Sequence, residues 1–233
     1  MSAYFGAIWR CRYFWLSLVK MDLRTRYRGS WLGIGWSLLQ PAAMTAIFCV
    51  VFTQIFPQTD FRTYAPMLMV GLACWNFVLN VTLQGCACFY QAEPYIRQYP
   101  APLAIYPLRT ALGGAFHFLV ALCLGMVLSW GLNGVHNPLV LFSLVPGLLL
   151  LVLFGWSLSV LAGLATVHFP DTKHLSEVTF QMIFYVTPII YPPSMVSGRL
   201  GVVMSCNPLS FFLDLFRDPI IQGQLPPDRK SVV

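Results

Sequence analysis

Long apolar stretches alternate with short charged segments along this chain of 233 residues. Four stretches contain no charged side chain: Gly29–Thr59, Thr63–Ala92, Thr110–Pro170 and Val178–Gly198. A membrane-spanning helix needs about 20 predominantly apolar residues, so the longest stretch holds two of them, separated by a polar turn at 133–138. Five spans are therefore predicted, at Leu32–Phe56, Tyr64–Phe89, Ala104–Leu132, Leu139–Val167 and Val178–Met195.

The composition supports a membrane protein built of helices. Hydrophobic residues make up 58% of the chain and charged residues only 9%, whereas soluble domains carry roughly 25% charged residues. Uninterrupted apolar runs are typical of spanning helices and not of barrel strands, which alternate between apolar and polar residues. We therefore predict an all-α integral membrane protein with one helical-bundle domain over residues 1–233. In it, 1–30 is cytoplasmic, 31–198 holds the spans and 199–233 forms an outer surface segment.

The positive charge of the chain is concentrated at its N-terminus. Residues 1–30 carry +5 of the net charge of +6, and Lys20, Arg24 and Arg28 recur there every four residues. Because segments rich in lysine and arginine stay in the cytoplasm, the N-terminus is predicted to lie inside.

The segment Ser2–Arg28 has the pattern of an amphipathic helix that lies along the cytoplasmic membrane interface. Its apolar face consists of Leu16, Val19, Leu23 and Tyr27. The basic residues fall on another face, and aromatic rings supply anchors for the headgroup layer. Asp22 is placed to pair with Arg26, one helical turn further on. A simple topology anchor with no further role is the alternative interpretation.

One polar stripe crosses the second predicted span. Asn76, Asn80 and Gln84 are spaced by four residues and therefore share a helix face. Polar side chains at membrane depth face protein or water and not lipid. The stripe either joins helices by hydrogen bonds or lines a translocation path, and the sequence leaves both interpretations open.

The second cytoplasmic loop, 91–109, contains four prolines and three tyrosines and does not resemble a flexible linker. Proline is favoured at the first position of a helix. Pro94 therefore predicts a short helix that includes Tyr95–Tyr99 and is presented to a partner.

The fifth apolar segment is interrupted by prolines, at Thr187-Pro188 and Tyr191-Pro192-Pro193. The backbone groups that a proline leaves free are not tolerated in lipid, so a helix that breaks near the outer leaflet is predicted. Asn207-Pro208 is a helix start signal. The apolar face that follows it predicts a short helix on the outer membrane surface and consists of Leu209, Phe212, Leu213 and Phe216.

The chain lacks the groups on which most catalysis depends. None of its three lysines follows a glycine, so it contains no phosphate-binding loop. Its only glutamates, Glu93 and Glu177, lie outside the middle of the spans, which argues against a proton relay. The chain is therefore predicted not to be an enzyme by itself and to hold no cofactor.

Histidine and cysteine side chains are expected to be structural. His168, Asp171 and His174 have the spacing of metal ligands, but a proline interrupts the helix that would align them, and no metal site is predicted. His117 is expected to be packed or hydrogen-bonded within the bundle. Of the seven cysteines only Cys206 falls on the outer side, so no structural disulfide is predicted.

Several motifs, in order, resemble a known transporter family. From Leu18 the chain reads L-V-K-M-D-L-R-T-R-Y-R-G-S-W-L-G-I-G-W-S-L-L-Q-P, and it continues with Asp171 before K-H-L, T-P-I-I-Y-P at 187–192, N-P-L at 207–209 and F-R-D at 216–218. These motifs, between about residues 15 and 220, are similar to those of ABC-2 type permeases that export polysaccharides or polyol phosphates. Pro170 departs from the family pattern, which has an arginine there.

The resemblance implies a homodimer of permease chains that binds two ATP-binding subunits in the bacterial inner membrane. Its substrate is expected to be an undecaprenyl-diphosphate-linked glycan, such as O-antigen, capsule or a teichoic-acid-like polymer, and no nucleic acid is involved. Family members have six spans, whereas five fit this sequence, which places its last residues outside. An ABC-2 exporter of drugs or small lipids and a membrane scaffold that transports nothing are the alternatives.

Three groups of residues are assigned roles in this hypothesis. Guanidinium groups bind phosphate oxygens in pairs, so the diphosphate is expected to be attracted by Arg24, Arg26, Tyr27 and Arg28. The resemblance implies coupling to the ATP-binding subunit by the second cytoplasmic loop, through Glu93, Tyr95, Arg97 and Tyr99. It also implies a gate at the outer end of the path, formed by Pro188, Tyr191, Asn207 and Arg217.

Overall fold

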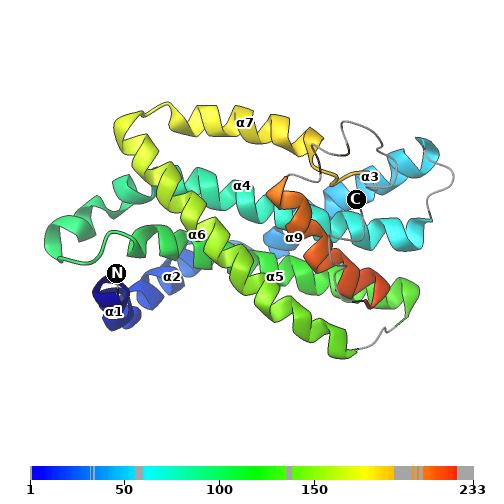
Figure 1. The fold of residues 1–233 in the computed structure, drawn as a ribbon, viewed down its shortest axis with the longest axis horizontal. Coiled ribbons are helices and arrows are strands. Elements are labelled where there is room, and N and C mark those ends of the chain that lie inside the picture. Colours follow the sequence, from blue (N-terminus) through cyan, green and yellow to red (C-terminus); the bar gives the residue numbers. More distant parts are fainter. Residues whose placement is uncertain are drawn as a thin grey trace. The chain divides into compact units, whose positions relative to one another are not determined.

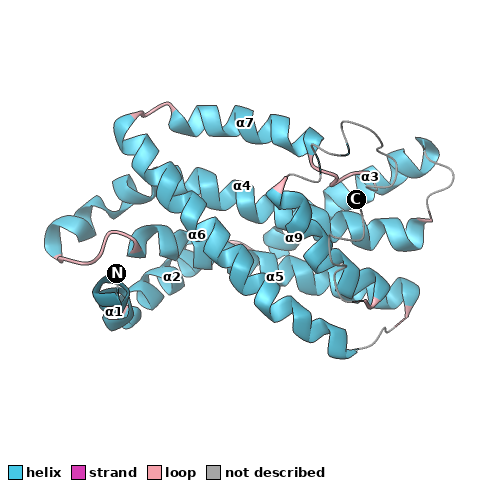
Figure 2. Ribbon diagram, in the orientation of Figure 1, coloured by secondary structure: helices cyan, strands magenta, loops and turns pink. Residues whose placement is uncertain are grey.

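The computed structural model describes residues 2–31, 33, 35–55, 60–134, 138–191, 201, 204 and 207–224. Every regular element in these ranges is a helix, and no strand occurs among them (Figure 2). The all-α prediction is therefore confirmed. Predictions that rest on Pro192, Pro193 or Cys206 lie outside the described residues.

Four helical segments are long and apolar enough to cross a membrane, as predicted for the first four spans. They are α3 (Gly35–Ile55), α4 (Phe61–Gln98), α5 (Ile105–Asn133) and Val140–His168. The last of these joins the end of the 3₁₀ helix η1 (Pro138–Ser143) to α6 (Leu144–His168). The apolar runs place the bounds of these spans to within three residues, except that α4 extends nine residues beyond its predicted end.

The fifth apolar segment forms a shorter helix. Helix α7 (Thr172–Val186) has 15 residues, which gives a length of about 22 Å, less than the roughly 30 Å of a bilayer core. It ends immediately before Thr187-Pro188, so the predicted break is confirmed. Further along the chain, α9 (Pro208–Arg217) starts at the predicted Asn207-Pro208 signal and is followed by η3 (Asp218–Gln222).

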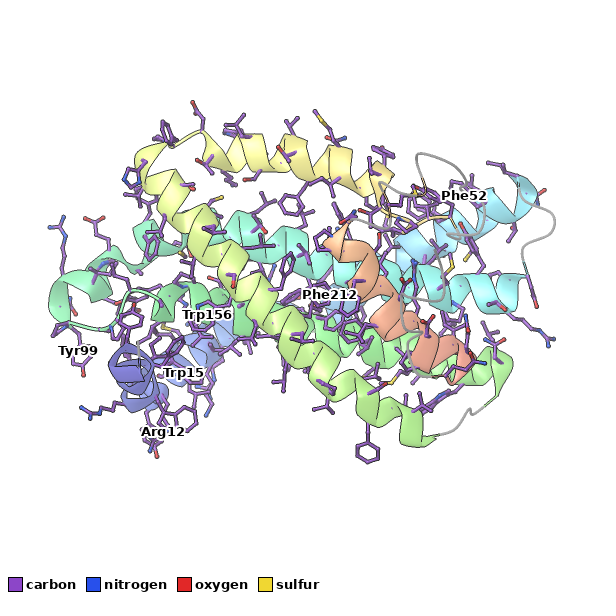
Figure 3. The ribbon with its side chains drawn as sticks, in the orientation of Figure 1. Arg12, Trp15, Phe52, Tyr99, Trp156 and Phe212 are labelled. Carbon is purple, nitrogen blue, oxygen red and sulfur yellow. The ribbon has the colours of Figure 1, made fainter. Side chains whose placement is uncertain are left out.

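The N-terminal segment is divided, and the prediction of one continuous helix over Ser2–Arg28 is wrong. Helix α1 (Ser2–Arg10) and α2 (Arg12–Tyr27) are separated at Cys11. The indole nitrogen of Trp15, labelled in Figure 3, donates to the carbonyl of Ile8 over 3.3 Å. This bond satisfies a carbonyl near the end of α1, where the regular helix leaves it without a partner.

The segment predicted to be the second cytoplasmic loop also differs from the prediction, because α4 continues through Pro94 to Gln98 as one helix of 38 residues. A proline removes a single backbone donor, and two contacts hold this part of α4 in place. Ala92 is fully buried in a cluster with Leu18 of α2 and Tyr106 of α5. Glu93 and Arg97 form an ion pair one turn apart. The expected separate helix is therefore the last turn of α4, and Tyr99 follows directly after it.

The described chain forms two compact units, and α4, α5, α6 and α7 each contribute to both. The first unit comprises Met1–Ile34, Phe77–His117 and Val152–Gln181. Within it, α1 and α2 lie beside the loop that joins α4 to α5 (Figure 1), where the backbone nitrogen of Ala104 donates to the hydroxyl of Tyr4. The indole of Trp156 on α6 donates to the carbonyl of Ala104 over 3.1 Å (Figure 3).

Small residues allow α4 and α6 to approach closely within the first unit. A Cβ atom at Gly85 would lie 2.7 Å from Ser159 Cα, and one at Gly163 would lie 2.8 Å from a ring carbon of Phe89. Such contacts between small residues replace the hydrophobic driving force that lipid cannot supply.

The second unit comprises Gly35–Asn76, Phe118–Leu151 and Met182–Val233. Cys49 of α3 packs in its core with Leu68 of α4. On α9, Phe216 is fully buried and its ring centroid lies 5.1 Å from that of Phe118 on α5. The hydroxyl of Ser129 on α5 donates to the carbonyl of Ile220, which ties η3 to the same helix.

Candidate functional site

A pocket of about 440 Å³ lies within the first unit, among α2, α4 and α5. Helix α2 contributes Asp22 and Arg26, α4 contributes Gln84, and α5 contributes Tyr106 and Arg109. Titratable and amide side chains thus converge on one cavity of a chain that is mostly apolar. This is the pattern of a site that orients a ligand through a few polar groups.

The strongest interaction in the pocket joins α5 to α2. Arg109 donates from Nε and Nη2 to the two carboxylate oxygens of Asp22. The side chain of Arg109 is only 14% exposed and that of Asp22 37%. The predicted pairing of Asp22 with Arg26 is therefore wrong, because a guanidinium from a distant segment binds the carboxylate through both of its oxygens.

A second contact between α2 and α5 involves Tyr27 and His117. The tyrosine hydroxyl and His117 Nδ1 are 2.8 Å apart, and the two rings meet edge to face. His117 also lines the pocket. The prediction that His117 is hydrogen-bonded within the bundle is confirmed.

The structure separates the four residues predicted to attract phosphate. Arg26 lines the pocket, and Tyr27 binds His117. Arg24 and Arg28 are exposed and do not line this pocket. Arg24 lies two residues from Arg26 on α2 and is therefore on another face of the helix. Arg28 follows the last residue of α2 and has an extended backbone conformation.

Tyr106 is a pocket residue that the sequence did not reveal. It is 1% exposed, and its buried hydroxyl has no hydrogen-bond partner among the described residues. A buried hydroxyl without a partner costs free energy unless water or a ligand binds it. Arg109 was also missed as a site residue, although its position as the last charge before the longest apolar run is a usable signal.

The polar stripe of α4 contributes one residue to the pocket. Gln84 lines it, and Asn80, one turn earlier in the first unit, is exposed. Asn76 belongs to the second unit and is half-buried. Because most of this helix is buried, an exposed polar face is a distinctive feature of it.

The residues expected to couple the chain to an ATP-binding subunit fall into two pairs at the end of α4. Glu93 and Arg97 are exposed, and their ion pair spans 2.6 Å. Tyr95 and Tyr99 instead pack on Phe14 of α2, with ring centroids 6.3 and 5.7 Å away. The first pair is therefore exposed, whereas the second packs against α2.

The second unit brings three of the four predicted outer-gate residues into one network around Arg217. The buried guanidinium donates to the carbonyls of Met67, Pro188 and Ile189 over 3.2, 2.7 and 2.9 Å. Asn207 reaches the same turn, donating from Nδ2 to Thr187 Oγ1 over 2.8 Å. The bonds to Pro188 and Ile189 satisfy carbonyls that the break after α7 leaves without helical partners. The bond to Met67 ties this turn to α4.

Burial lowers the pKa of Arg217 to about 10, so its guanidinium remains charged at neutral pH. A charged donor gives each of its hydrogen bonds roughly twice the strength of a neutral one. The fourth predicted gate residue, Tyr191, is placed differently. Its hydroxyl donates to the carbonyl of Tyr185 near the end of α7.

The remaining candidates form no site in the described part of the chain. No group of three metal-ligating side chains occurs there. His174 lies 3.5 Å from Glu177 one turn along α7, and His168 Nδ1 lies 3.0 Å from the carbonyl of Leu164. The six described cysteines are free thiols.

Comparison with known proteins identifies the family. Residues 13–221 match the ABC-2 type transporter family. An O-antigen export system permease protein RfbA of Klebsiella pneumoniae is 24% identical over 220 residues, which cover 93% of this chain and 83% of the relative. The RfbA permease of Myxococcus xanthus is 23% identical, covering 91% and 81%. The polysialic acid transport protein KpsM of Escherichia coli is 18% identical, covering 90% and 81%.

The chain therefore belongs to the ABC-2 type transporter family, as the sequence motifs predicted. It is a multi-pass membrane permease, and the members of this family are transport subunits and not enzymes.

Proposed function

We propose that this chain is the membrane permease of an ATP-driven exporter that moves a lipid-linked polysaccharide or polyol phosphate out across the inner membrane. The observation that carries this proposal is its similarity, over nine-tenths of its length, to permeases named for O-antigen export and for polysialic acid transport. Two copies of the permease assemble with two copies of a separate ATP-binding subunit. The N-terminus faces the cytoplasm, as its charge indicates.

The pocket supports an anionic substrate. Arg26 and Arg109 line it, and guanidinium groups are well suited to phosphate oxygens. In this proposal Arg26 binds the diphosphate of the lipid carrier directly, and Tyr27 acts through His117. Arg24 and Arg28 attract the anion from the exposed face of α2.

Gln84 leads from the pocket to the other stripe residues of α4, Asn80 and Asn76. This face is proposed to line the translocation path because its amide groups bind sugar hydroxyls without holding them tightly. The outer gate is the turn held by Arg217, with Asn207 and Pro188 as its other parts and Tyr191 at the end of α7.

The exposed pair of Glu93 and Arg97 is proposed to receive the ATP-binding subunit. Movement of α4 then reaches α2 through the stacking of Tyr95 and Tyr99 on Phe14. Such contacts pass a displacement from one helix to the next because packed rings do not compress.

Deletion of the gene tests the proposal. A lipid-linked glycan is expected to accumulate inside the deletion strain, and the intact gene is expected to restore its export. Accumulation of a small lipid or a drug, with normal surface glycan, would instead support the alternative ABC-2 exporter. Purification of the chain without any ATP-binding protein would support a membrane scaffold.

A further inference from the structure

The Arg109 guanidinium is occupied by a carboxylate of its own chain. Arg109 donates from Nε and Nη2, the edge of the group that presents two parallel donors, and Asp22 accepts with both oxygens. A phosphate group is bound by arginine through the same paired geometry. Asp22 therefore takes the position on Arg109 that a phosphate of the substrate would take.

The pocket around this ion pair has a positive charge and a hydrogen-bonding group that its own residues do not balance. Its three charged side chains are Asp22, Arg26 and Arg109, with a net charge of +1. Tyr106 adds a buried hydroxyl without a partner among the described residues, and Gln91 adds an amide. A cavity with surplus positive charge and an unsatisfied hydroxyl fits an anion that also accepts hydrogen bonds.

We propose that Asp22 is an internal substitute for the substrate anion, which neutralises Arg109 while the pocket is empty and is displaced when a diphosphate binds. The inference rests on the proposed function, since it describes how the substrate diphosphate replaces Asp22 on Arg109 when it enters the pocket. A poorly exposed arginine needs a counter-charge in the empty state, because an unpaired buried charge is strongly destabilising. The substrate supplies this counter-charge itself once it is bound.

The exchange acts on α2 as a whole. Asp22 and Arg26 lie one turn apart on the same face of α2. When the anion takes Arg109 from Asp22 and also binds Arg26, α2 loses an ion pair to α5 and gains a contact through the ligand. Binding therefore changes how α2 is attached to α5, while Arg109 keeps a counter-charge in both states.

The competing explanation is that Asp22 only positions Arg109 for the substrate. The two explanations predict opposite effects of Asp22→Asn. If Asp22 competes with the anion, removing its charge strengthens anion binding. If Asp22 only holds Arg109 in place, the same substitution weakens binding or leaves it unchanged.

The test measures anion affinity of the full chain in nanodiscs of zwitterionic lipid at constant ionic strength. The probes are inorganic pyrophosphate, which is a free anion, and farnesyl diphosphate, which is attached to a lipid. Asp22→Asn is compared with Asp171→Asn, which changes the net charge equally from an exposed position that does not line the pocket. We expect Asp22→Asn to bind tighter than wild type by at least about fivefold, and Asp171→Asn to match wild type.

The double variant Asp22→Asn with Arg109→Gln keeps the test valid if Asp22→Asn folds poorly, because it leaves no unpaired charge. It is expected to bind more weakly than wild type, since the receptor for the anion is then absent. A larger gain for farnesyl diphosphate assigns the site to a lipid-linked anion, and a larger gain for pyrophosphate assigns it to a soluble one. Either gain supports the exchange.

Two other outcomes distinguish failure of the proposed exchange from failure of the proposed function. If wild type binds a probe and Asp22→Asn binds it equally or more weakly, the exchange is overturned and the proposed function is unaffected. If neither protein binds either probe, the pocket is not an anion site and the exchange is overturned as well. The proposed function is tested separately by the deletion strain, and normal export of glycan by that strain would overturn it.

Discussion

Gly71 of α4 provides the space that the guanidinium of Arg217 occupies. A Cβ atom at residue 71 would overlap Nη2 of Arg217 and would also contact Ile189. The same arginine binds the carbonyls of Pro188 and Ile189. A residue without a side chain on one helix thus permits a buried charge on another to hold the turn after α7.

Gly71→Ala is therefore expected to displace Arg217 and to release the turn at 187–190. Overpacking of this kind costs about 1–3 kcal/mol of stability, and surface glycan is expected to fall. Thermal unfolding of the purified protein and immunodetection of surface glycan measure the two effects. The matched control is Gly131→Ala, since a Cβ at Gly131 meets no atom within 4 Å. Equal behaviour of the two variants would contradict the proposed role of Gly71.

Arg217→Lys is expected to impair export although the positive charge is retained. A lysine presents one compact ammonium and does not reproduce the planar array of donors that reaches three carbonyls. Each charge-assisted bond lost costs about 1.5–3 kcal/mol. The measurement is export in cells together with the melting temperature. Arg62→Lys, at an exposed position in the first turn of α4, is the control and is expected to resemble wild type.

Single substitutions on α2 are expected to separate direct binding from general attraction. Arg26→Gln removes a charge that lines the pocket and should reduce export by about tenfold or more, whereas Arg24→Gln and Arg28→Gln should each have a smaller effect. Initial rates of glycan appearance at the surface provide the measurement. Lys20→Gln, on the same face as Arg24, controls for the loss of charge. Topology is checked in each variant by cysteine labelling, and a uniform effect of all four substitutions would argue for attraction alone.

The triple substitution of Arg24, Arg26 and Arg28 by glutamine is expected to stop export while the protein still inserts. Its effect should exceed that of Arg26→Gln alone, because it removes the long-range attraction together with the direct contact. Membrane fractionation confirms insertion, and surface glycan reports export. Normal export by this variant would exclude α2 as the phosphate-binding element.

Gly163→Val is expected to destabilise the first unit by forcing α6 away from α4. The new side chain would meet Phe89 and Cys88, which lie 2.8 and 3.0 Å from an ideal Cβ. The loss is expected to be about 1–3 kcal/mol, seen as a lower unfolding temperature in detergent. Gly131→Val, on an open helix face, should unfold close to wild type, and the comparison fails if both variants lose equal stability.

The first four spans were predictable from the sequence because each depends on a local run of apolar residues. The break at Thr187-Pro188 and the helix start at Asn207 were predictable for the same reason, since both rest on adjacent residues. The pairing of Asp22 with Arg109 joins residues 87 positions apart, and no periodicity within α2 specifies it. Likewise, Pro94 is a local signal for the start of a new helix. The burial of Ala92 against Leu18 and Tyr106, which holds α4 together there, joins distant segments and is not visible in the local sequence.

The arrangement around Arg217 also has a consequence for how the protein is made. Pro188 and Ile189 precede Arg217 in the chain, so their carbonyls leave the ribosome before the guanidinium that binds both of them. Free carbonyls are costly in lipid. The turn after α7 is therefore completed only after α9 has been synthesised, which makes its closure a late step in the insertion of each new chain.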